Sequence, residues 1–179
     1  MRRPTRQLAV AVGVITILAA GGAATVAWSE DSSTVGNTVH ETLTGYQEDP
    51  LVLSTTGNGQ FQIHIDEAAQ EISYELSYAS LEGSVLQAHI HIGGASQSGG
   101  ISVFLCTNLG NGPAGTQLCP AAPATVSGTI RPADVIGPAG QGVTAGQFGE
   151  LLAAIRAGKT YANVHSTMYP GGEIRAQID

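Results

Sequence analysis

The stretch QAHIHIGG, residues 87–94, places two histidines one residue apart in an otherwise apolar run. Side chains alternate along a β-strand, so His89 and His91 would share one face, opposite Ile90. Two imidazoles on one face stand close enough to bind a common ion, and copper and zinc both accept imidazole nitrogen. The same pattern also describes an ordinary half-buried strand, so both interpretations stay open at this point.

Other histidines fall on the polar side of expected strands. His165 lies in TYANVHS and His64 in GQFQIHID, each opposite the apolar residues of its run. Three or four neutral imidazoles suit copper or zinc, and His165 would complete a site with His89 and His91 if their strands are neighbours. We expect such a site on the outer face of the sheet, where solvent exposure alone would also place polar side chains.

Signals for other chemistry are missing from the chain. It contains no Gly-x-Ser-x-Gly nucleophile elbow and no glycine-rich phosphate loop. No Ser, His and Asp set is marked by a local signature. We therefore leave the question of an enzyme open and favour a protein without catalytic activity.

The remaining pattern predicts the fold class. Short runs of alternating apolar and polar residues recur between turn signals, as in half-buried antiparallel strands. Residues 144–159 show helical spacing instead, with Thr144 and Gln147 as a capping box and Gly158 as the C-terminal stop. We expect an all-β fold, an antiparallel β-sandwich or barrel with one short helix. The expected strands are residues 59–66, 71–80, 86–93, 101–106, 125–130, 160–166 and 173–178.

The N-terminal segment predicts export. Residues 1–27 combine three arginines with a long uncharged run that ends in small residues, which indicates a signal peptide or an uncleaved signal anchor. Residues 28–40 form an expected linker, and the domain is expected over residues 41–179. The protein would then be secreted or held in the extracytoplasmic cell envelope, with membrane association only if the segment is retained as an anchor.

Charge excludes one class of partner. Without residues 1–27 the chain keeps four basic and fourteen acidic residues, a net charge of −10. Nucleic acids and anionic lipids require clustered basic side chains. The four that remain are scattered along the chain: Arg131, Arg156, Lys159 and Arg175.

The chain has two cysteines, Cys106 and Cys119, separated by a loop rich in glycine and proline. In an exported protein such a pair most simply forms a disulfide bond. Metal thiolates or free thiols are the alternatives, but the CxxC spacing typical of a thiolate site is absent.

Four motifs carry a family resemblance: LTGYQEDP at residues 43–50, ISYELSYASLEG at 72–83, AHIHIGG at 88–94 and NVHSTMYPGGEIRAQI at 163–178. With them, residues 41–179 resemble the chordin-type domain family, written CHRD, found in chordin and in exported microbial proteins. The resemblance implies an immunoglobulin-like β-barrel with a distant similarity to copper/zinc superoxide dismutase. No general activity is assigned to the family.

The distant dismutase similarity implies roles for particular residues. By that pattern His89, His91 and His165 would bind copper, and Arg175 would steer an anionic substrate. His64 would be a possible fourth ligand, and if the protein were an enzyme it would be dismutase-like.

Two functional hypotheses follow. The first is an exported, non-enzymatic binding module whose partner is an unidentified protein or glycan. The second is a copper-binding protein, or less readily a zinc-binding one, that uses the three histidines.

Overall fold

A computed structural model describes residues 37–179 of the chain. Eight strands form one antiparallel sheet in the order β5-β4-β7-β8-β1-β2-β3-β6. The strands are β1 (Thr38–Thr44), β2 (Asn58–Asp66), β3 (Glu71–Ala79), β4 (Val85–Ile92), β5 (Ile101–Thr107), β6 (Ala124–Ile130), β7 (Thr160–Ser166) and β8 (Ile174–Ile178). Short 3-10 turns follow β1 at Gly45–Gln47 and follow β6 at Pro132–Asp134 and Ala139–Gln141.

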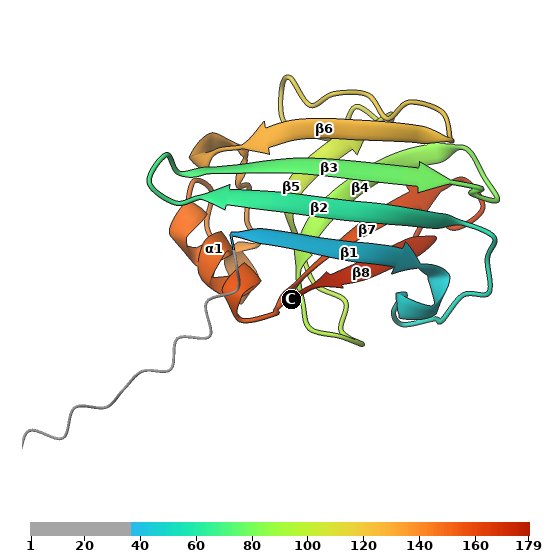
Figure 1. The fold of residues 1–179 in the computed structure, drawn as a ribbon, viewed down its shortest axis with the longest axis horizontal. Coiled ribbons are helices and arrows are strands. Elements are labelled where there is room, and N and C mark those ends of the chain that lie inside the picture. The colour runs from blue at the N-terminus through green and yellow to red at the C-terminus, as the bar shows by residue number, and fades with distance from the viewer. Residues whose placement is uncertain (1–36) are drawn as a thin grey trace, which may run out of the picture. The chain divides into compact units, whose positions relative to one another are not determined.

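The sheet curls into two layers that enclose the core. Strands β1, β2, β3 and β6 form the front layer in Figure 1, and β4, β5, β7 and β8 cross behind it. The edge strands β5 and β6 lie near each other without a ladder of hydrogen bonds between them, so the barrel is nearly closed. This architecture confirms the expected all-β class.

The first strand was not expected. β1 begins at Thr38, so residues 38–40 belong to the sheet although the sequence places them in a linker. Its buried apolar side chains are Val39 and Leu43, and the polar residue Glu41 lies between them on the same face, which interrupts the apolar pattern. Pairing with β2, where Thr38 lies opposite His64, makes this polar segment a strand.

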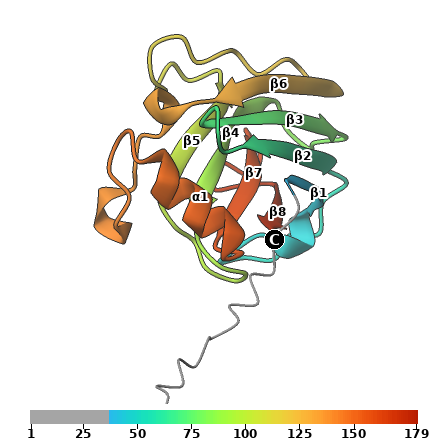
Figure 2. The ribbon, with the colours of Figure 1, turned by 60° about the vertical axis from the view of Figure 1, so that its left-hand side comes forward.

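The helix α1 (Phe148–Arg156) closes one end of the barrel (Figure 2). It ends as expected, because Gly158 adopts a left-handed φ of +61° and its N–H donates to Ile155. The capping box forms only in part: the Thr144 N–H donates to Gln147 Oε1 at 2.7 Å, but the helix begins one turn later than Thr144. The apolar face that α1 buries consists of Phe148, Leu151, Leu152 and Ile155.

The disulfide between Cys106 and Cys119 is confirmed, with Cα atoms 5.0 Å apart. It holds the loop after β5 against the seam between the edge strands. Within that loop the Gln117 carbonyl accepts from the Thr107 N–H, and the Gln117 side chain donates to the Tyr74 hydroxyl at 2.8 Å. The loop therefore ties β5 to β3 across the open side of the barrel.

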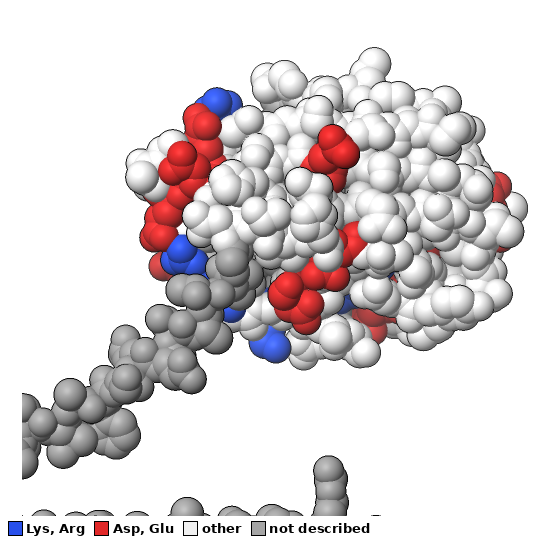
Figure 3. Space-filling model, in the orientation of Figure 1, with Lys and Arg blue, Asp and Glu red and all other residues white. Residues whose placement is uncertain are grey.

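The expected signal segment, residues 1–27, lies outside the described residues. Within residues 37–179 no helix is long and apolar enough to cross a membrane. The basic side chains on the face drawn in Figure 3 are few and well separated. All strands and the buried core belong to one compact unit of the chain, Ser33–Asp179.

Removal of the disulfide is expected to destabilise this unit. The cysteines are 13 residues apart in sequence. Loop-closure entropy then predicts a loss of about 3 kcal/mol from the free energy of unfolding in the variant C106S/C119S. Urea unfolding measures the loss, and wild-type protein unfolded with a reductant serves as the matched control. Equal stability of oxidised and reduced protein would contradict the prediction.

Candidate metal centre

Three histidines from two neighbouring strands converge in the structure. β4 pairs with β7 so that Gln87 lies opposite His165 and His89 lies opposite Asn163. His89 Nδ1 lies 3.2 Å from His165 Nε2. One nitrogen from each of His89, His91 and His165 lies within 4.8 Å of the others. The pairing of β4 with β7, on which the expected three-histidine site depends, is therefore present.

The opposite neighbour of β4 is irregular at the same place. β5 carries an extra residue twice, because the register shifts between Ala88 and His89 and again between Ile90 and His91. Such bulges increase local twist and redirect side chains. The ring of Phe104, which lies opposite His89 in β5, packs edge-on against that imidazole with centroids 4.5 Å apart.

The cluster is buried, which corrects the expectation of an outer-face site open to solvent. The exposed fraction is 0% for His89 and 7% for both His91 and His165. These side chains do point away from the hydrophobic core, as alternation requires, but two loops cover them. Gly99 in residues 93–100, here called the covering loop, contacts His91, and Pro170 in the β7–β8 loop contacts His165.

Backbone carbonyls orient two of the rings. His91 Nδ1 lies 2.9 Å from the Gly99 carbonyl oxygen, and His165 Nδ1 lies 2.9 Å from that of Pro170. A carbonyl oxygen only accepts, so both Nδ1 atoms carry a proton and both Nε2 atoms present a lone pair. Among the residues that the structure describes, His91 Nε2 is buried without a hydrogen-bond partner, as is His89 Nε2. Unpaired buried ring nitrogens are costly and call for a functional explanation.

Burial keeps the three rings neutral. It lowers the pKa of His89 to about 2, with further lowering by the neighbouring His165 and His91. It lowers the pKa of His91 to about 4, although the Gly99 carbonyl acts in the opposite direction. The pKa of His165 is lowered by the same desolvation. At neutral pH all three therefore have the uncharged form that metal ligation needs.

The donor set fits a metal ion. Two nitrogens bound to one tetrahedral ion at about 2.0–2.1 Å lie about 3.3 Å apart, close to the 3.2 Å between His89 Nδ1 and His165 Nε2. The largest separation in the set, up to 4.8 Å, requires a side-chain shift of about 1 Å to reach a common ion. The contacts of both Nδ1 atoms with carbonyls are the outer-shell arrangement usual for metal-binding histidines.

Three further residues complete the surroundings, although the sequence analysis gave them no role. The Asn163 side-chain amide lies 3.2 Å from His165 Nε2. The Tyr161 ring stacks on His91 at 4.7 Å with an interplanar angle of 2°. Their positions on the same face of β7 as His165 were a usable signal. Gly99 carried no such signal, because its role depends on the path of the covering loop.

Arg175 is separated from His91 by the ring of Tyr161. It is 1% exposed, and its guanidinium sits 3.5 Å from the centroid of the Tyr161 ring. β7 lies between β4 and β8, so His91 and Arg175 approach Tyr161 from opposite sides. A guanidinium buried behind a tyrosine is poorly placed to attract an anion from solution, which argues against the expected steering role.

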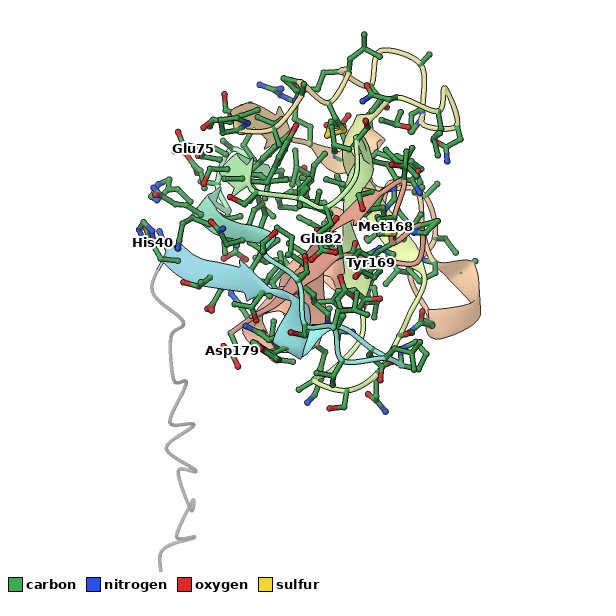
Figure 4. The ribbon with its side chains drawn as sticks, turned by 90° about the vertical axis from the view of Figure 1, so that its right-hand side faces the viewer. His40, Glu75, Glu82, Met168, Tyr169 and Asp179 are labelled. Atoms are coloured by element: carbon green, nitrogen blue, oxygen red, sulfur yellow. A yellow bond between two sulfur atoms is a disulfide. The ribbon has the colours of Figure 1, made fainter. Side chains whose placement is uncertain are left out.

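The structure does not bring the remaining histidines to the cluster. His64 is exposed on β2 and contacts the Thr38 hydroxyl at 3.1 Å. His40 is exposed on β1, and Figure 4 shows it at the edge of the fold, away from Met168 and Tyr169, which belong to the β7–β8 loop. His64 is therefore not placed to act as the fourth ligand.

Fold and cluster together define a disulfide-bonded antiparallel β-barrel with a polar site enclosed between the sheet and its loops. The CHRD domain profile matches residues 39–178. The chain belongs to the CHRD-domain family, and this membership points to a binding module. No curated protein and no solved structure matches the chain.

The buried imidazoles predict acid sensitivity. The pKa of an unfolded histidine is about 6.5, above the folded values of about 2 for His89 and about 4 for His91. Below pH 6.5 the unfolded chain binds protons that the folded protein does not. Between pH 6.5 and its folded pKa, each of these histidines then lowers the free energy of unfolding by about 1.4 kcal/mol for every unit by which the pH falls.

Urea unfolding at pH 7 and pH 5 measures this effect. Burial raises the pKa of Glu48 to about 7, so protonation of this carboxyl adds stability as the pH falls through the same range. Because this opposes the effect of the histidines, the pH dependence is compared between variants that all keep Glu48. H91Q is expected to lose less stability between the two pH values than H64Q, whose substituted side chain is exposed. Equal pH dependence of the two variants would show that buried His91 is not responsible.

Proposed function

We propose that this domain is an extracytoplasmic binding module whose ligand is a single metal ion, copper before zinc, held by His89, His91 and His165. The observation that carries the proposal is the convergence of three buried, neutral imidazoles, with His91 Nε2 left unpaired. A purely structural polar cluster would be expected to satisfy its own hydrogen bonds.

The choice of copper rests on the composition of the donor set. All three donors are imidazoles, and among the described residues no cysteine or carboxylate joins the group. Structural zinc sites almost always have four ligands, and a nitrogen site binds copper more tightly than zinc. When bound, copper would bring a redox-active ion into an enclosed site, whereas the chain's own part is to hold and shield it.

The extracytoplasmic location is supported by two features. Cys106 and Cys119 form a disulfide, a bond that persists in oxidising compartments. The N-terminal run of residues 1–27 has the composition of an export signal. The geometry of the buried histidine cluster favours a metal ion over a glycan or protein as the ligand of this site.

Metal titration tests the proposal. Calorimetry of Ser33–Asp179 with copper(II) and with zinc is expected to show one equivalent of copper bound with submicromolar affinity and weaker binding of zinc. The variant H89Q/H91Q/H165Q is expected to lose the copper binding, because its amides are poor copper ligands. H64Q is the matched control, since it removes a histidine outside the cluster, and it should bind like wild type.

Two outcomes would refute a three-histidine copper site. One is the absence of copper binding by the wild-type protein, and the other is equal binding by wild type and the triple variant. Circular dichroism establishes that each variant is folded. If the triple variant does not fold, H91Q replaces it, because loss of one of three ligands should still weaken binding strongly.

A further inference from the structure

The covering loop is held down from the sheet by a buried cation. Arg175 Nη2 donates to the carbonyl oxygens of Gly94 and Gln97, at 2.8 and 3.2 Å. These two residues form a turn, in which the Gln97 N–H donates to the Gly94 carbonyl. The guanidinium also lies on the ring of Tyr161. A single side chain thus joins β8, β7 and the turn of the covering loop.

Within residues 37–179 the Arg175 charge has no carboxylate partner. Among residues 37–179 the ion pairs formed by lysine and arginine are Arg131 with Glu71 and Arg156 with Glu67, both on the surface. The Glu48 carboxyl is the acidic group near enough for Arg175 to lower its pKa, yet the two form no ion pair. Burial of a charge without a carboxylate partner is costly. The hydrogen bonds that Arg175 donates to the covering loop therefore need an explanation.

Two residues beyond this turn, the same loop touches His91. Gly99 accepts from His91 Nδ1 through its carbonyl, and its N–H donates to the Tyr161 hydroxyl at 3.1 Å. A Cβ at position 99 would lie 1.6 Å from the Ile92 carbonyl oxygen, so only glycine fits there. The orientation of the His91 ring therefore depends on how the covering loop is seated.

We propose that Arg175 is a positioning residue for the histidine cluster: by clamping the Gly94 and Gln97 carbonyls it seats the covering loop, and the Gly99 carbonyl then holds His91 with Nδ1 protonated and Nε2 free. This inference rests on the proposed metal function and adds to it the device that prepares one ligand. Arginine suits the task because its planar guanidinium can stack on Tyr161 while donating to the loop.

The tautomer of His91 is a direct readout that does not require metal. Two-bond proton–nitrogen correlation spectra of metal-free Ser33–Asp179 distinguish protonated from unprotonated ring nitrogens. Wild type is expected to show His91 as one tautomer, with the proton on Nδ1. R175M is expected to show a mixture of both, and its copper affinity is expected to fall roughly 10- to 100-fold, as for other outer-shell changes.

The variants separate positioning from general stability. R131M removes an arginine from a surface ion pair and should leave both the tautomer and copper binding unchanged. R175K keeps the positive charge but not the planar fork, and it should give intermediate values for both. A folded R175M with His91 wholly protonated on Nδ1 and wild-type copper affinity would overturn the proposal.

The outcome stays decisive if R175M does not fold. R175K then carries the test, and wild-type tautomer together with wild-type copper affinity in that variant would reject the clamp. If the wild-type protein binds no copper, the proposed function fails, whereas the His91 tautomer in the metal-free variants still decides whether Arg175 positions this ring. Failure of one proposal is thereby distinguishable from failure of the other.

Discussion

The register between β4 and β7 is the constraint on which the candidate site depends. It brings His165 next to His89 although the two are 76 residues apart in the chain. A shift of one residue would turn the histidines of one strand toward the core and the apolar side chains toward the loops. The register is secure because Ala88, Ile90, Ala162 and Val164 all pack in the core on the other face.

The second constraint is the cost of enclosing the polar face. Antiparallel sheets commonly leave one face in water, and the outer face of β2 follows this rule, as exposed His64 shows. Over β4 and β7 the loops exclude water instead, so the imidazoles must be neutral and hydrogen-bonded to avoid a large penalty. The Gly99 and Pro170 carbonyls meet only part of that demand. A bound ion would satisfy the unpaired His91 Nε2.

The surroundings of the cluster form one connected system. His91, Tyr161 and Arg175 stack in sequence across β4, β7 and β8, and the covering loop contacts all three. Such packing leaves few independent ways for one ring to move, so the positions of ligand and loop are coupled. The bulges in β5 belong to this system as well, since they place Phe104 against His89.

The sequence by itself determined the all-β class, seven of the eight strands, the end of the helix and the shared face of His89 and His91. All of these are local consequences of side-chain alternation and of glycine conformation. Residues 38–40 escaped prediction because β1 owes its form to pairing with β2 more than to its own pattern. Strand alternation and the family resemblance both linked His165 to the other two histidines, but neither showed that the site is covered.

Only the tertiary structure decided which polar residues are buried. His64 and His89 have the same local pattern, yet one is exposed and the other has no exposed surface. The same holds for Arg175, which the sequence analysis expected to steer an anionic substrate and the fold encloses behind Tyr161. Alternation specifies the face on which a side chain lies, whereas its solvation depends on loops that arrive from distant parts of the chain.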